Sequence, residues 1–121
     1  MKKVKTVFVA HPISGNVEEN LRKVVAICKE IHTAEVIPIF PSFTWRQYLE
    51  NGETATQRLA DAVNLEYFRR GMVDEIWFYG DRMSEGMVRE AILGSRFGIR
   101  LMGMTHETRV AGAELRRLGK I

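Results

Sequence analysis

Glu90 is the side chain in this sequence whose type and surroundings most favour chemistry. It falls within residues 85–97, which have helical periodicity, and no polar side chain lies three or four positions from it. Those neighbours are Gly86, Met87, Leu93 and Gly94. A helical wheel places the exposed stripe at Glu85, Arg89 and Arg96, so Glu90 is predicted to be partly desolvated. Carboxylates in such surroundings are either paired, here with an arginine of a neighbouring segment, or used in catalysis.

Two loops carry groups suited to anions and are expected near Glu90. Residues 11–16 and residues 80–86 each follow a predicted strand and lead into a helix N-terminus, where free amides and the helix dipole favour a phosphate. Both loops contain residues that let a backbone approach a ligand or that donate a hydroxyl group: Ser14, Gly15, Ser84 and Gly86. Strand-to-helix turns use the same residue types for geometry alone, so neither loop by itself indicates a site.

Alternating strands and helices must position these groups. Short apolar runs rich in β-branched and aromatic residues predict strands at 6–10, 36–40, 75–79 and 99–104. Periodicity predicts helices at 17–32, 54–71 and 85–97, with a final helix in the remainder through 111–118. The expected N-caps are Asn16, Thr54 and Ser84. Pro38 favours an edge or bulged strand, and residues 41–52 are expected to form a loop.

This alternation predicts a single α/β domain over residues 1–121. Helices between successive strands imply right-handed crossovers, and hence a parallel sheet covered on both faces. We expect a three-layer sandwich with a sheet of four or five parallel strands, Rossmann or flavodoxin-like in type. Ligands of such sheets bind outside the carboxyl ends of the strands, where strand order reverses. Both loops and Glu90 are predicted to lie at that edge.

The composition is that of an ordinary globular protein, and the charge pattern argues against some classes of binding partner. Hydrophobic residues make up 45% and charged residues 27% of 121 residues, which excludes disordered and fibrous classes. The net charge is +3, but the cations are spread among acids, so we expect no nucleic acid partner. The first apolar run ends at His11 and Pro12, too short for an export signal or a membrane span. The single Cys28 fits a reducing compartment, so a cytoplasmic location is expected.

Three segments together resemble the nucleoside 2-deoxyribosyltransferase-like superfamily. They are VFVAHPISG at residues 7–15, DEIWFYGD at 74–81 and SEGMVRE at 84–90. The resemblance is greatest to small, largely uncharacterised, often phage-associated members, and it runs from the first predicted strand to the fourth. Its most specific part is the Ser-x-Gly-x-x-x-Glu pattern that ends at Glu90.

The resemblance implies a role for each matching position. In that superfamily the glutamate of this motif attacks the anomeric carbon of a nucleoside or nucleotide, and a second base or water resolves the covalent intermediate. Glu90 would accordingly be the nucleophile, which suits a carboxylate facing an oxocarbenium-like transition state. The resemblance implies that Ser14 and Gly15 hold the sugar or its 5′ group, and that Ser84 and Gly86 donate to a 5′-phosphate. His11, Pro12 and Met87, in the same matching segments, are also expected to bind substrate.

One position departs from the superfamily pattern. Active members usually carry an aspartate in the helix before the third strand, where this chain has Asn64, which is neither an acid nor a base. Asp61, one turn earlier, or Asp81, in the following loop, could substitute, so the candidate catalytic set is Glu90, Asn64 and Asp81. The aromatic-rich residues 40–48 could stack a nucleobase, or pack on the core or a second subunit.

The leading hypothesis is an enzyme that acts on the N-glycosidic bond of a nucleoside or nucleotide, as hydrolase or deoxyribosyltransferase. The alternative is a nucleotide-binding or sensing module without turnover, which Asn64 favours. A purely structural or partner-binding role would leave Glu90, between two loops suited to anions, unexplained. We expect no metal ion, no cofactor and no membrane association, and a homodimer or larger assembly in which one subunit completes the pocket of the other.

Overall fold

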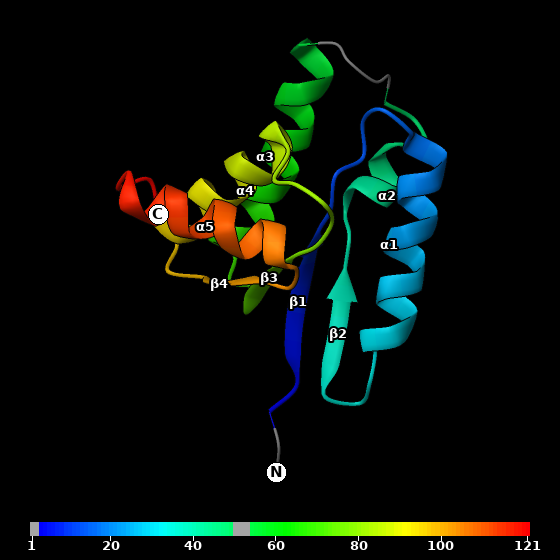
Figure 1. The fold of residues 1–121 in the computed structure, drawn as a ribbon. Coiled ribbons are helices and arrows are strands. Elements are labelled where there is room, and N and C mark those ends of the chain that lie inside the picture. Colours follow the sequence, from blue (N-terminus) through cyan, green and yellow to red (C-terminus); the bar gives the residue numbers. More distant parts are fainter. Residues whose placement is uncertain (1–2, 50–53) are drawn as a thin grey trace.

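The chain folds into a four-stranded, all-parallel sheet with helices on both of its faces, the three-layer α/β sandwich that the sequence predicts (Figure 1). The computed structural model describes residues 3–49 and 54–121. In chain order the elements are β1 (Lys5–Ala10), α1 (Val17–Ile31), β2 (Val36–Ile39), α2 (Ser42–Trp45), α3 (Thr54–Arg69), β3 (Glu75–Phe78), α4 (Glu85–Arg96), β4 (Arg100–Gly103) and α5 (His106–Arg117). Within the described residues, no helix is long and apolar enough to cross a membrane.

The strand order is β2-β1-β3-β4, so the chain reverses direction across the sheet at β1. The α1 connection leads from β1 to β2 on one side, and the next connection crosses back to place β3 on the other side of β1. The carboxyl ends of β1 and β3 therefore flank the reversal point, where ligands of such sheets bind. Pro38 lies in the edge strand β2, opposite Val7, and the predicted edge position is confirmed.

Different helices cover the two faces of the sheet (Figure 1). One core cluster joins β1 and β3 to α3, α4 and α5, and its buried members are Phe8, Ala10, Phe68, Val73, Ile76, Phe78, Met87, Ala91 and Leu115. A smaller cluster on the other face joins β1 to α1 through Val9, Ile13 and Val24. Phe8 and Ala10 thus face one way and Val9 the other, as alternation along a strand requires.

Glycine allows close packing at two places beside the core. A Cβ on Gly94 in α4 would lie 2.5 Å from Cδ1 of Ile76, so α4 rests directly on β3. A Cβ on Gly103 at the end of β4 would lie 2.8 Å from the backbone nitrogen of Arg109, so α5 passes equally close to β4. These contacts fix the heights of α4 and α5 above the sheet.

Two predicted N-caps are confirmed, and two boundaries differ from expectation. The Asn16 and Ser84 side chains accept hydrogen bonds from the backbone amides of Glu19 and Met87. The segment expected to be a loop contains the short helix α2, because Pro41 supplies the helical φ that starts a turn; positions 50–52 of that expectation lie outside the described residues. The last helix begins at His106, where Thr105 and Thr108 form a capping box.

Replacing Gly103 with alanine should destabilise the fold by about 2 kcal/mol, because the added methyl group would overlap the Arg109 backbone, which cannot turn aside as a side chain would. Gly112→Ala in α5 is the matched control, since a Cβ there has nothing within 4 Å. That change should raise stability by up to about 1 kcal/mol through helix propensity. Urea unfolding measures both free energies, and equal stability of the two variants would refute the close packing of α5.

Candidate functional site

A cleft of about 620 Å³ opens at the carboxyl ends of the strands. Its walls come from the turn after β1, from the segment after β2, from α3, and from α4 with the loop before it. These segments are far apart in sequence and meet where strand order reverses. The volume is typical of small-molecule sites.

Glu90 faces this cleft from the second turn of α4 and is partly buried. Burial raises the pKa of its carboxyl group to about 8; Arg89, the Asn64 amide and Arg46 oppose the rise, and Asp61 adds to it. The Asn64 Nδ2 group donates a hydrogen bond of 3.4 Å to Oε2 of Glu90. None of the ion pairs in the described part of the chain includes Glu90. The site therefore holds a carboxyl group that is mostly protonated at neutral pH.

The α3 wall of the cleft carries three polar side chains at helical spacing, Gln57, Asp61 and Asn64. Gln57 donates to Oδ1 of Asp61 at 2.9 Å, and the Arg89 Nε atom lies 3.6 Å from the same oxygen. Asp61 thus lines the cleft but already accepts a hydrogen bond from Gln57 and forms an ion pair with Arg89. Of the two aspartates that could replace an acid at Asn64, Asp61 is the one in the cleft.

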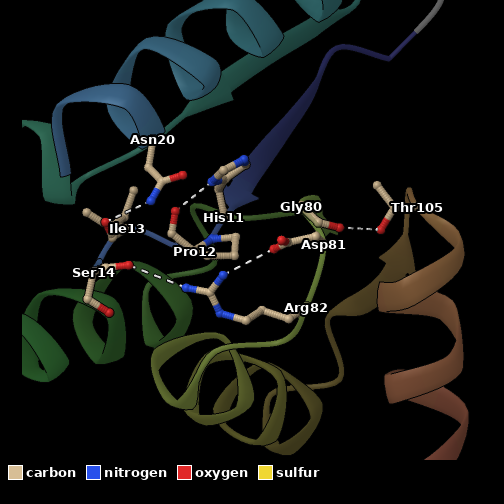
Figure 2. A network of polar contacts seen from close by, with 9 residues as sticks. All are labelled: His11, Pro12, Ile13, Ser14, Asn20, Gly80, Asp81, Arg82 and Thr105. Atoms are coloured by element: carbon tan, nitrogen blue, oxygen red, sulfur yellow. Dashed lines mark hydrogen bonds and ion pairs between the residues drawn. The ribbon is translucent and has the colours of Figure 1, made fainter. Parts of the chain in front are cut away.

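The turns after β1 and β3 are locked together (Figure 2). Pro12 is fully buried against Gly80, where a Cβ would lie 2.5 Å from the Pro12 Cδ atom, and Gly80 has a φ of +98°. Arg82 spans the gap: its guanidinium donates to the Ser14 carbonyl oxygen at 3.4 Å and pairs with Asp81 at 3.1 Å. On the far side, Thr105 Oγ1 donates to the Gly80 carbonyl oxygen at 2.8 Å.

The N-terminus of α4 forms the cationic rim of the cleft. Ser84 and Gly86 line it, and Arg82 and Arg89 lie in the same wall. The Ser84 oxygen accepts from the Met87 amide, which leaves its hydroxyl hydrogen available to a ligand. Free amides of a first helical turn and a hydroxyl suit an anion, and the two guanidinium groups add positive charge, although Arg82 pairs with Asp81, Arg89 pairs with Asp61, and the Glu85 carboxylate lines the same wall.

Part of the aromatic segment also reaches the cleft. Phe40 and Trp45 line it, and the Arg46 guanidinium carbon lies 4.8 Å from the centre of the Trp45 ring. Phe43 and Tyr48 are exposed, and neither lines the cleft. Phe40 also packs against the core cluster of Val9, Ile13 and Val24, so Trp45, with Arg46 beside it, is the aromatic side chain of this segment better placed to meet a planar ligand.

A comparison of the sequence with known protein families assigns the chain to a family. Residues 5–102 match the family model described as Domain of unknown function (DUF7768). The chain belongs to this family. No curated protein and no solved structure matches the chain.

The DUF7768 match contains every residue that lines the cleft, from Phe8 to Glu90, and leaves out α5. The cleft is therefore a feature of the family region of the chain. The description of DUF7768 gives no activity, so the function has to be argued from the side chains of the site.

Most of the residues singled out in the sequence meet in the DUF7768 cleft, and three do not. Those that line it are His11, Ser14, Asn64, Ser84, Gly86, Met87 and Glu90. Pro12 is buried behind the wall, and Gly15 is exposed outside it. The Asp81 side chain is 81% exposed and paired with Arg82, so it does not line the cleft. Met87 is 1% exposed and belongs chiefly to the core.

Several polar residues of the DUF7768 cleft are not among the site residues that the sequence predicts; Gln57, Arg46, Arg82 and Arg89 are four of them. The spacing of Gln57 from Asp61 and Asn64 is the signal that places these three side chains on one helix face. Arg46 was grouped with its aromatic neighbours, and no local pattern indicates that it faces Glu90. Within the described residues, no three His, Cys, Asp or Glu side chains gather as a metal site.

Glu90→Gln should make the protein more stable at alkaline pH. A carboxyl group whose pKa rises from 4.5 to about 8 on folding stabilises the fold at acid pH, and this contribution is lost as pH increases from about 4.5 to 8. The variant should therefore exceed wild type by on the order of 2 kcal/mol at pH 8.5, and the difference should shrink towards pH 5.

Thermal and urea unfolding at both pH values measure this difference, with the exposed Glu30→Gln on α1 as the matched control. Glu30→Gln should follow wild type at each pH. A Glu90→Gln variant whose advantage is the same at pH 5 and pH 8.5 would contradict the burial of this carboxyl group.

Proposed function

We propose that this chain cleaves the N-glycosidic bond of a nucleoside or nucleotide, as a hydrolase or deoxyribosyltransferase, with Glu90 as the nucleophile. The observation that carries the proposal is a partly buried carboxyl group without an ion pair in the described residues, facing a cleft large enough for a nucleotide. The resemblance of residues 84–90 to the superfamily motif supports the same reaction.

The proposed chemistry has two steps. In the first, the ionised Glu90 carboxylate bonds to the anomeric carbon while the carbon–nitrogen bond to the base breaks and its electron pair leaves with the base. In the second, water or another base attacks the same carbon and releases the carboxylate. Arg46, Arg89 and the Asn64 amide favour the ionised form, and the positive charge developing on the sugar would favour it further.

The rest of the cleft would hold the remaining parts of a nucleotide. A 5′-phosphate would lie at the α4 N-terminus, near Ser84 and Arg82, where amide, hydroxyl and guanidinium donors converge. The base would lie towards Trp45. A nucleoside 5′-monophosphate is the substrate that uses all three regions.

A nucleotide-binding module without turnover is the second candidate, and Asn64 favours it. The departing base needs a proton, and the position from which the superfamily supplies one is held by an amide. Asp61 lies in the cleft, but Gln57 and Arg89 already engage it. Recovery of a stabilising nucleotide in unchanged form would favour this candidate. The homodimeric assembly and cytoplasmic location also stay predictions.

Incubation of the protein with the four 2′-deoxynucleoside 5′-monophosphates should release free base, which chromatography detects. Glu90→Ala should lower the rate by about 10³-fold or more because the nucleophile is lost. Glu30→Gln, on α1 and away from the cleft, should release base at the wild-type rate. The wild-type kcat/KM should rise with pH towards about 8, as Glu90 ionises.

No release from any nucleoside or nucleotide at high enzyme concentration would contradict the proposal. A rate that falls as pH passes through 8 would instead identify Glu90 as an acid rather than a nucleophile.

A further inference from the structure

His11 lies where the two ligand-facing turns meet, and its ring has one unused nitrogen. The residue immediately follows β1, is 8% exposed and contributes to the cleft wall. Its Nε2 atom lies 3.7 Å from the position that a Cβ on Gly80 would occupy, so the ring sits between the ends of β1 and β3. This is the place where strand order reverses.

The other ring nitrogen fixes the tautomer of His11. Nδ1 lies 2.6 Å from the Pro12 carbonyl oxygen, and a carbonyl oxygen can only accept, so Nδ1 carries the hydrogen and donates it. In the neutral ring Nε2 then has a lone pair and no hydrogen. Figure 2 shows one ring nitrogen joined to Pro12 and the other turned away from it. Among the hydrogen bonds of the described residues, His11 makes the one to Pro12.

The surroundings of His11 keep the ring neutral. Burial lowers its pKa below the ordinary value of 6.5, and the positive charges of Lys23 and Arg82 act in the same direction. The hydrogen bond to Pro12 and the charge of Asp81 raise the pKa and only partly offset the decrease. At pH 7 and above, Nε2 is therefore an acceptor.

We propose that Nε2 of His11 accepts a hydrogen bond from a donor group of the bound ligand, and that this donor is a sugar hydroxyl. A phosphate or carbonyl oxygen has no hydrogen to offer and would meet a lone pair, so those groups do not fit at this position. A hydroxyl or a base N–H fits. A hydroxyl is favoured over a base N–H because of where the side chains lie. His11 follows the carboxyl end of β1, whereas Trp45, the aromatic group suited to a base, comes from a different wall of the cleft, the segment after β2. This assignment rests on the proposed function and adds selectivity for the sugar.

The test separates the two ring nitrogens. In His11→Asn, the side-chain amide can still donate to Pro12 in place of Nδ1, but the Nε2 acceptor is gone. In His11→Phe, the donor to Pro12 and the Nε2 acceptor are both removed. Thermal unfolding of the two variants then reports what the hydrogen bond to Pro12 contributes to the stability of the fold. All affinities are measured by titration calorimetry at pH 7.5 in a Glu90→Gln background, so that nucleotide is not consumed.

The ligands are ribonucleoside, 2′-deoxynucleoside and 2′,3′-dideoxynucleoside 5′-monophosphates, each with all four bases. With His11 present, removal of one of the two hydroxyls should weaken binding about tenfold, the effect of one buried hydrogen bond. In His11→Asn the same removal should change affinity less than twofold. Because each comparison lies within one variant, a general loss of stability cancels.

A hydroxyl preference that His11→Asn retains overturns the proposal. The proposal is also overturned if His11→Asn loses a preference among the four bases but keeps the preference among the sugars, because the donor is then a base N–H. If neither wild type nor the Glu90→Gln protein binds any of these nucleotides, the proposed function itself fails and the sugar assignment fails with it. Binding without His11-dependent sugar selectivity refutes the sugar assignment alone.

Discussion

The close seating of α4 on β3 is the contact on which the site depends. Gly94 lets the helix approach Ile76 so closely that an added Cβ would lie 2.5 Å from it. Glu90 is four residues earlier, one turn away, so the contact that fixes the height and rotation of α4 also fixes where this carboxyl group points. Met87 and Ala91, each 1% exposed, pack into the core on the adjoining positions. Glu90 is left at the side of the buried stripe, turned towards α3.

That placement has an energetic cost which packing elsewhere must offset. A carboxylate loses hydration when buried, and the hydrogen bond from Asn64, at 3.4 Å, returns little of it. Arg46 and Arg89 act through their charges without forming an ion pair with Glu90 in the described structure. A carboxyl group in such surroundings destabilises the fold when it is ionised. This favours the interpretation that Glu90 has a functional role in which its charge changes, rather than a structural role.

The two turns at the strand ends show how segments far apart in the sequence form one wall of the cleft. The buried Pro12 and the glycine conformation at Gly80 hold the turns against each other, and Arg82 spans the gap to Ser14. His11 and the α4 N-terminus then present an acceptor and a group of donors to one cleft. A ligand with hydroxyls at its centre and an anion at one end suits this distribution of polar groups.

The sequence alone predicted those features of the fold that depend only on residues close together in the chain, such as the faces and the starts of helices. Helical periodicity placed Glu90 off the exposed stripe, and the cap residues Asn16 and Ser84 set the starts of α1 and α4. The outward direction of Asp81 could not be predicted, because it follows from pairing with Arg82, which is itself held by a carbonyl oxygen 68 positions away.

The approach of Arg46 to Glu90 likewise depends on how α2 follows the edge strand, and the short helix α2 has too few residues for a periodic signal. A contact between distant segments can be predicted only when the fold is known. The buried face of a helix can be predicted from the sequence of that helix alone.

Direct titration of Glu90 by ¹³C NMR, observing the side-chain carboxyl carbon, tests the central claim that this carboxyl group is desolvated in the cleft. Glu90→Gln identifies its resonance by the loss of one signal. The account predicts a midpoint near pH 8. A midpoint near the ordinary value of 4.5 would mean that the group is solvated, and would contradict the account.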